Sequence, residues 1–251
     1  MTRGLLAVGL AVAHLIGCAS VPPNERTVLA GGPDLTLLIL PFNVAAVMPP
    51  ELDAGSPVVW KELKLYLRAH GKRLKTVSFR DARRFWLSSI RQVRAGEKGA
   101  RAGYDDASRV LVLELAKHAE FDTVIAPSLF IRNAPITERI ATWDGVERPV
   151  EVEENGPGAG SIPADTTLSG LAPAASLHAV VLDANGDKLQ EAQGGLELLV
   201  RVRVLEEDAP GSQPTFEFAA RTDLFANREH LREGIAEALA PFLPPLPLKT
   251  E

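Results

Sequence analysis

Apolar positions change their spacing several times along the chain, and each change marks an expected element. Residues 35–42 (LTLLILPF) form a nearly continuous aliphatic run, which predicts a strand buried on both faces. From Ser56 the spacing becomes helical, with Ser56 as N-cap, Pro57 in the first turn and Gly71 just beyond the end. The apolar face of this first helix comprises Val59, Leu63, Tyr66 and Leu67.

Two more helices and two strands follow in the same half of the chain. Residues 74–79 alternate like a short strand, and a second helix is expected over 80–94. Glycines within 95–103 end it, a third helix is expected over 105–118, and the apolar run 121–132 predicts another strand. The apolar side of the second helix comprises Phe79, Ala82, Trp86, Ile90 and Val93.

The second half of the chain reads mainly as strands. Residues 136–152 predict a hairpin around the type I′ turn signal Asp144-Gly145. Further strands are predicted over 176–182, 188–193, 196–205 and 215–221, with Gly194-Gly195 permitting a bulge or bend. A last helix is expected after the N-cap Asn227, with Leu231, Ile235, Leu239 and Phe242 at 4-4-3 spacing.

This order of elements predicts an α/β fold. Strands alternate with helices first and then follow one another, which indicates a mixed sheet, parallel in its first part and antiparallel later, with helices packed on it. The expected organisation is a single domain over 35–251. Residues 153–173, rich in Gly and Pro, predict a long mobile loop within it.

The N-terminal segment has the pattern of an export signal. One positive charge, Arg3, precedes an apolar stretch over 4–16 that is too short to cross a bilayer, which takes roughly 20 apolar residues. Residues 1–17 are therefore interpreted as a signal peptide, and the polar, Pro-containing stretch 18–34 as a flexible tether.

The end of this segment, Leu15-Ile16-Gly17-Cys18, resembles the lipobox of bacterial lipoproteins. The resemblance implies cleavage between Gly17 and Cys18 and a lipidated Cys18, carrying palmitate-type acyl chains that anchor the protein in a membrane. Ala19 rather than Asp after the cysteine implies sorting to the outer membrane, on its periplasmic face. The alternative is an ordinary signal peptide with an incidental cysteine.

Composition changes this picture little. Apolar residues make up 46% and charged residues 24% of the 251 positions, as in ordinary globular chains. Cys18 is the only cysteine, so an intramolecular disulfide is excluded and the core alone must hold the fold.

No motif of a known catalytic chemistry stands out. The nucleophile elbow, P-loop, zinc-protease helix and Ser-x-x-Lys patterns are missing, and the run 156–160 (GPGAG) lacks the strand and helix that phosphate cradling requires. His70, His118, His178 and His230 lie at no metal-ligand spacing, and Glu151, Glu153 and Glu154 read as solvated surface. We expect no cofactor, no metal and no enzymatic activity.

Basic residues are concentrated between Trp60 and Arg101. Thirteen Lys or Arg stand there against three acids, although the whole chain has a net charge of −5. On the second helix, five arginines fall within about a 100° arc opposite the apolar side: Arg80, Arg83, Arg84, Arg91 and Arg94. They form either a face for an anionic partner or a solvated helix surface.

The domain also resembles a group of periplasmic domains. The residues that carry the resemblance are LILPF at 38–42, VSFRDARRF at 77–85, AEFDTVIA at 119–126, the hairpin VVLDANGDKL at 180–189 and the C-terminal helix. The group comprises the amino-terminal domain of TolB, the curli-secretion lipoproteins and the lipoprotein activators of penicillin-binding proteins. The resemblance covers residues 35–243, and the insert 153–173 departs from it.

The resemblance implies non-enzymatic work in the cell envelope. We therefore expect an outer-membrane-anchored periplasmic lipoprotein that acts as a binding or assembly module. Its partner would be an envelope protein or an anionic envelope polymer; nucleic acid is not expected for an exported, net-acidic chain. The alternatives are a subunit of a secretion or export complex and a hydrolase of envelope polymers.

Overall fold

The computed structural model describes residues 34–96, 103–153, 168–205, 215–240 and 242–243. Its elements are, in chain order, β1 (Thr36–Ile39), α1 (Pro50–Asp53), α2 (Ser56–Ala69), β2 (Arg73–Thr76), α3 (Phe79–Gly96), α4 (Tyr104–Ala116), β3 (Thr123–Thr137), β4 (Ile140–Trp143), β5 (Val146–Pro149), β6 (Gly170–Asp183), β7 (Lys188–Leu198), β8 (Val200–Leu205), β9 (Thr215–Ala220) and α5 (Arg228–Leu239).

A seven-stranded mixed sheet organises the molecule. β1 lies between β2 and β3 and is parallel to both, whereas β6 and β7 add antiparallel strands beyond β3. The far half of β3 also pairs with β4, which pairs with β5, while β8 and β9 form a separate ribbon. The predicted α/β class with a mixed sheet is therefore confirmed.

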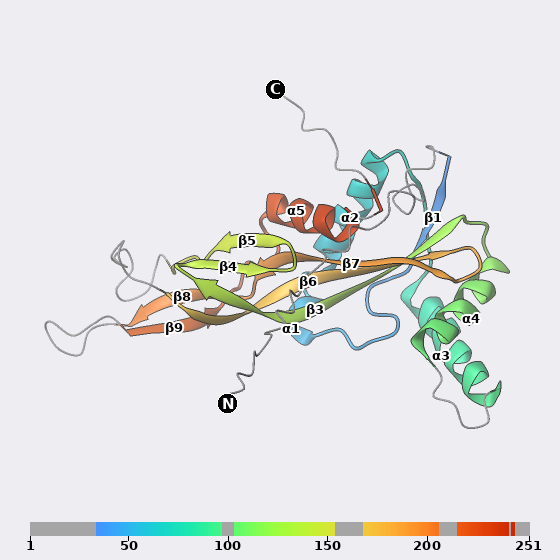
Figure 1. The fold of residues 1–251 in the computed structure, drawn as a ribbon, viewed down its shortest axis with the longest axis horizontal. Coiled ribbons are helices and arrows are strands. Elements are labelled where there is room, and N and C mark those ends of the chain that lie inside the picture. Colours follow the sequence, from blue (N-terminus) through green and yellow to red (C-terminus); the bar gives the residue numbers. More distant parts are fainter. Residues whose placement is uncertain (1–33, 97–102, 154–167, 206–214, 241, 244–251) are drawn as a thin grey trace, which may run out of the picture.

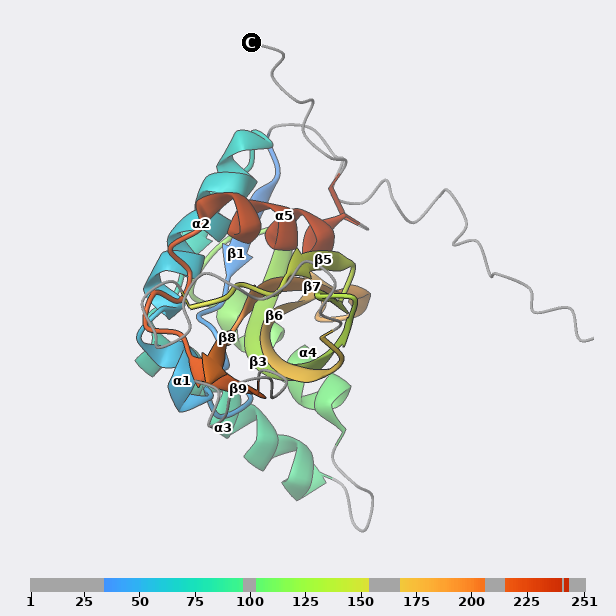
Figure 2. The same cartoon turned by 90° about the vertical axis from the view of Figure 1, so that its left-hand side faces the viewer.

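The long strands β3 and β6 run through the whole molecule (Figure 1). They are paired along nearly their whole length. The elements β1, β2, α3 and α4 lie near one end of this pair, and β4, β5, β8 and β9 lie near the other. Seen along this axis, the strands curl around one another rather than lying flat (Figure 2).

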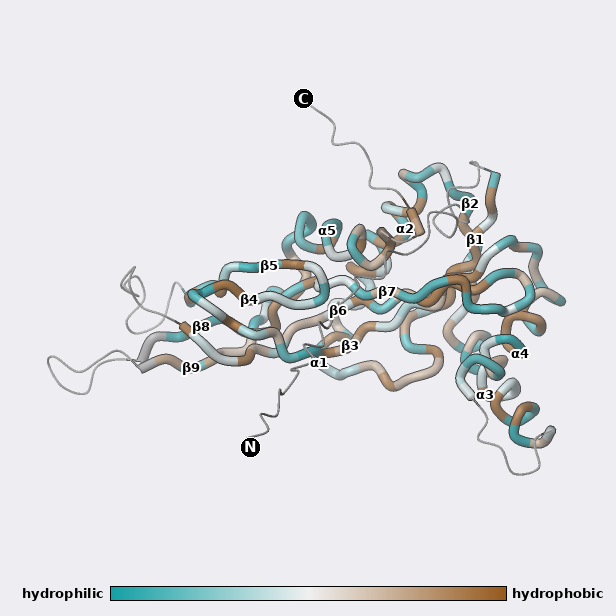
Figure 3. Tube along the Cα trace, in the orientation of Figure 1, coloured by the Kyte–Doolittle hydropathy of each residue, from teal (hydrophilic) through white to brown (hydrophobic). Residues whose placement is uncertain are grey.

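Helices cover both faces of the parallel part of the sheet. Because alternate side chains of a strand point to opposite faces, Leu37 and Ile39 pack with α2 and α5, while Leu38 and Leu40 pack with α3 and α4. A third cluster of buried apolar residues lies under β4 and β5. Hydrophobic colour is accordingly strong on β1 and the adjoining strands (Figure 3).

Three expectations about local structure are wrong. Gly55, not Ser56, is the N-cap of α2: a Cβ at Gly55 would lie 2.2 Å from Cδ2 of Phe225, so a serine does not fit there. The Pro-containing stretch 44–55, which the sequence predicts to be a loop, contains the short helix α1. Phe79 begins α3 but is 54% exposed, so it is not part of that helix's buried side.

The loop expected over 153–173 also ends earlier in the structure than the sequence predicts. β6 begins at Gly170, because the extension of β3 to Thr137 gives residues 170–173 a complete ladder of partners. Leu168 is buried as well. Most of that expected loop, 154–167, lies outside the described residues, as do the signal segment and nearly all of the tether.

Candidate functional site

A pocket opens at the carboxyl ends of β1 and β2, which is where ligands bind in open sheets with parallel strands. Its volume is about 510 Å³, within the range of small-molecule sites. The chain builds it from four segments: the loop after β1, the junction of α1 and α2, the loop after β2 and the first residue of α3.

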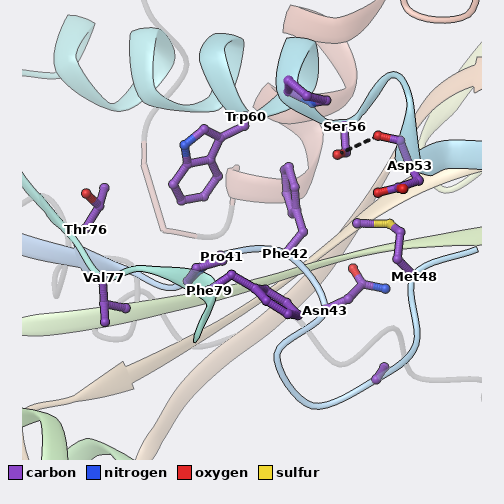
Figure 4. Close-up of a pocket in the computed structure, with 12 residues that line it drawn as sticks. Pro41, Phe42, Asn43, Met48, Asp53, Ser56, Trp60, Thr76, Val77 and Phe79 are labelled. Carbon is purple, nitrogen blue, oxygen red and sulfur yellow. Dashed lines mark hydrogen bonds between the residues drawn. The ribbon is translucent and has the colours of Figure 1, made fainter. Parts of the chain in front are cut away.

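Three aromatic rings line the pocket. Trp60 on α2 meets Phe42 edge-to-face, with the ring centroids 5.5 Å apart, and Phe79 also lines the pocket (Figure 4). Nζ of Lys64 lies 5.4 Å from the Trp60 ring, a cation–π contact that holds the indole in place. Met48 adds a flexible thioether to the lining. Such a wall favours an apolar or aromatic group.

A few polar groups interrupt this wall. Asp53, Ser56 and Thr76 line the pocket, and Ser56 Oγ donates a hydrogen bond to the main-chain O of Asp53 at 2.9 Å (Figure 4). Asp53 is exposed, so its carboxylate is open to solvent at the rim. The polar groups can fix the orientation of a bound molecule, whereas the rings supply apolar contact area.

The loop after β1 is fixed from both sides. Asn43 takes a left-handed conformation (φ 57°) and is buried, and its amide side chain hydrogen-bonds the main chain of Leu129 on β3. On the other side, the guanidinium of Arg83 donates to the main-chain O of Val44. The pocket floor is therefore preformed.

The five arginines predicted as a basic face do not share one role. Arg83 is turned inward to the β1 loop, and Arg84 pairs with Asp81 at 3.1 Å. Arg80, Arg91 and Arg94 are exposed, and no ion pair involves them within the described part of the chain. The structure thus leaves three of the five side chains on the outer face of α3 available to a partner. Gly17 and Cys18 lie outside the described residues.

Sequence reasoning missed a buried cluster of charges between β7, the end of β9 and α5. Glu197 and Arg221 have only 2% and 5% of their side chains exposed and lie 3.3 Å apart. Arg221 also binds Glu151 and Asp223, both at 3.2 Å, and Nδ1 of His230 lies 3.5 Å from Glu197. Burial raises the pKa of Glu197, whereas the hydrogen bond from Arg221 lowers that of Asp223.

The same cluster corrects the expectation that the acids around residue 151 are merely solvated. Glu151 joins Arg201 at 3.0 Å, and Glu153 joins Arg203 at 2.5 Å. These pairs connect the segment after β5 to β8, and the parallel bridge between Val152 and Val202 lies between them. The two ion pairs therefore join the segment after β5 to β8 on both sides of this bridge.

A shallower hollow on the open face of the sheet is lined by Phe130, Arg132 and His178. Its polar side chains already have partners on neighbouring elements: Arg132 pairs with Asp144 at 3.1 Å, and Nε2 of His178 lies 2.9 Å from the carboxylate of Glu191. This hollow is a weaker candidate than the aromatic pocket for that reason.

In residues 34–96, 103–153, 168–205, 215–240 and 242–243, no group of three or more His, Cys, Asp or Glu could hold a metal ion. Among the helices of the same ranges, none is both long and apolar enough to cross a membrane.

Comparison with known proteins adds little. No family model matches the sequence, and no curated protein matches it. Among solved structures, the chain is similar to a neuraminyllactose-binding hemagglutinin homolog from Helicobacter pylori, at 9% identity over 82% of each chain with a TM-score of 0.33. A similarity this low supports no argument about function.

Proposed function

We propose that this protein is a lipid-anchored binding module of the outer membrane, which captures an apolar or aromatic group of its partner in the pocket between Phe42, Trp60 and Phe79. The observation that carries the proposal is the pocket itself: a concave, ring-lined site with a fixed floor and few polar groups. Pockets of this composition are typical of binding sites.

The binding half of the proposal is tested with a neutral apolar dye, N-phenyl-1-naphthylamine. Ala46 lines the pocket, whereas the neighbouring Ala45 does not, and both are exposed. Ala46→Trp should fill the site and weaken dye binding about ten-fold, an energy of about 1.4 kcal/mol. Ala45→Trp is the matched control and should bind like the wild type. Equal dye binding by all three proteins would refute a site at this position.

The anchoring half rests on Cys18 at the end of the lipobox-like segment. We expect labelled palmitate to enter the wild-type protein and to be lost in Cys18→Ser, which should then leave the membrane fraction. Outer and inner membranes are separated by density to test the sorting implied by Ala19. Label that persists on the serine variant would remove the lipid anchor from the proposal while leaving the pocket untouched.

A further inference from the structure

The outer face of α3 begins at the pocket. Phe79 is the first residue of α3, and its half-exposed ring lines the opening. Arg80 follows it directly on the exposed surface. The ring-lined site and the basic face of the helix are therefore one continuous surface, which a single partner can contact.

A ridge of five side chains runs along this face at alternating spacings of four and three residues, which keeps them on one stripe of a helix. In order they are Arg80, Arg84, Leu87, Arg91 and Arg94. Leu87, at the centre, is 40% exposed. With a rise of about 1.5 Å per residue, the ridge is roughly 20 Å long. An apolar contact point is thus flanked by guanidinium groups on both sides.

The positive charge of the ridge is not balanced on its own helix. Asp81 is the only acid in α3, and it binds Arg84 and the hydroxyl of Ser78. Arg80 and Arg91 have no ion-pair partner in the ranges that the structure describes. A guanidinium can bind a carboxylate or a phosphate with two parallel hydrogen bonds.

We infer that the partner is an acidic polypeptide segment, which seats one aromatic or aliphatic side chain in the pocket and lays its carboxylates along the ridge of α3. The inference rests on the proposed function and names the chemistry of its partner. Charge complementarity selects an anionic partner, and carboxylates spaced along an extended polypeptide match a ridge of this length. The pocket, with its edge-to-face rings, adds the apolar anchor that distinguishes such a segment from a plain polyanion.

The probe is a fluorescein-labelled synthetic peptide in which a Phe-Leu pair precedes a run of glutamates, and its anisotropy is measured with the purified protein. We expect it to bind about ten-fold tighter than the same peptide with glutamines. Raising the salt from about 50 mM to about 300 mM should weaken binding severalfold, because exposed charges are screened.

Two double variants locate the charge. Arg80→Glu with Arg91→Glu should lower affinity for the acidic peptide about ten-fold. Lys61→Glu with Arg68→Glu makes the same change of charge on the exposed face of α2 and should have much less effect. Both doubles alter exposed groups, so thermal unfolding should stay near that of the wild type.

A third variant locates the anchor. Phe79→Ser should weaken the peptide that carries Phe-Leu but should not affect a glutamate peptide that carries Gly-Ser in its place. Equal loss for both peptides would mean that the pocket takes no part, and the inference would be wrong.

Other outcomes overturn the inference without touching the proposed function. If the glutamine peptide binds as well as the glutamate peptide, or if both double variants lose binding equally, the ridge does not select carboxylates. If phosphatidylglycerol vesicles bind the protein through the same arginines and neither peptide does, the face contacts a membrane surface. In each case the neutral dye would still report an intact pocket.

Discussion

The side chain of Asn43 takes the place of a strand against Leu129: its Nδ2 donates to the main-chain O of Leu129 at 2.9 Å, and its Oδ1 accepts from the main-chain N at 2.8 Å. Beside it, the N–H of Asn43 donates to the main-chain O of Pro127 at 3.2 Å. The ladder between β1 and β3 therefore continues past the end of β1, carried by an amide instead of a backbone. These hydrogen bonds of the Asn43 side chain fix the pocket loop to the sheet.

Asn43→Ala should lower the free energy of unfolding by about 2–4 kcal/mol, because it leaves two buried main-chain groups of Leu129 without partners. Dye binding should weaken as well, since the pocket floor loses its support. Urea denaturation measures the first effect. Asn133→Ala, an exposed asparagine on the same strand, is the control and should change stability by less than about 0.5 kcal/mol.

Glu62 connects α2 to α5. Its side chain is 2% exposed, and its carboxylate binds the guanidinium groups of Arg228 and Arg232. Replacing both arginines with alanine strands a buried charge and should cost about 3 kcal/mol. Adding Glu62→Met should recover most of that loss, because an apolar side chain of similar size then fills the site. Chemical denaturation of the three proteins decides the point; no recovery in the triple variant would mean that the arginines act by packing instead.

Gly234 brings the backbone of α5 onto the backbone of β7. A Cβ at Gly234 would lie 2.0 Å from the main-chain O of Gly195, and one at Gly194 would lie 2.0 Å from that of Gly234. Gly234→Ala should therefore destabilise the protein by about 1–3 kcal/mol. Gly96→Ala in α3 meets nothing within 4 Å and should be neutral or slightly stabilising. Thermal unfolding should rank the two in this order.

Glu197 should make stability depend on pH in the direction opposite to an ordinary paired acid. Burial raises its pKa, so the folded state binds the proton more tightly than the unfolded chain, and protonation stabilises the fold as pH falls. Asp223 and Glu153 have lowered pKa values and contribute stability that is lost as pH falls through those values. The two effects oppose each other in the wild type.

Glu197→Gln imitates the protonated acid and isolates its contribution. Relative to the wild type, the variant should be most favoured near pH 8 and should lose that advantage towards pH 5 or so. Melting temperatures across this range provide the measurement, repeated in a His230→Gln background so that the neighbouring imidazole does not contribute. A relative stability that instead rises as pH falls would show that the carboxylate is held charged by Arg221.

Much of the fold could be predicted because local signals and packing agree. The aliphatic run that became β1, the turn at Asp144-Gly145 and the cap at Asn227 each combine a propensity with a pattern, and all three are confirmed. The glycine pair at 194–195 also lies at an irregularity of the β6–β7 ladder, as expected. Elements in which local residue preference and the apolar pattern agree can be predicted from a single sequence.

Contacts between distant segments could not be read in the same way. Phe225 excludes a side chain at Gly55, the N-cap of α2, so the residue type at that position depends on a residue far along the chain. Phe42 and Trp60 form one wall of the pocket because the loop after β1 packs against α2. The sequence shows the aromatic residues but not their convergence, and the same holds for the burial of Glu197 between elements from both halves.

The contact of α2 with α5 also sets an order of events during synthesis. The ribosome releases α2 early, but the helix that covers its apolar face, and the arginines that neutralise Glu62, belong to α5 near the other end of the chain. Until α5 has emerged from the ribosome, no helix covers the apolar face of α2. That face stays accessible to proteins that bind unfolded chains. The apolar face of α2 is therefore covered late in synthesis, although α2 itself is made early.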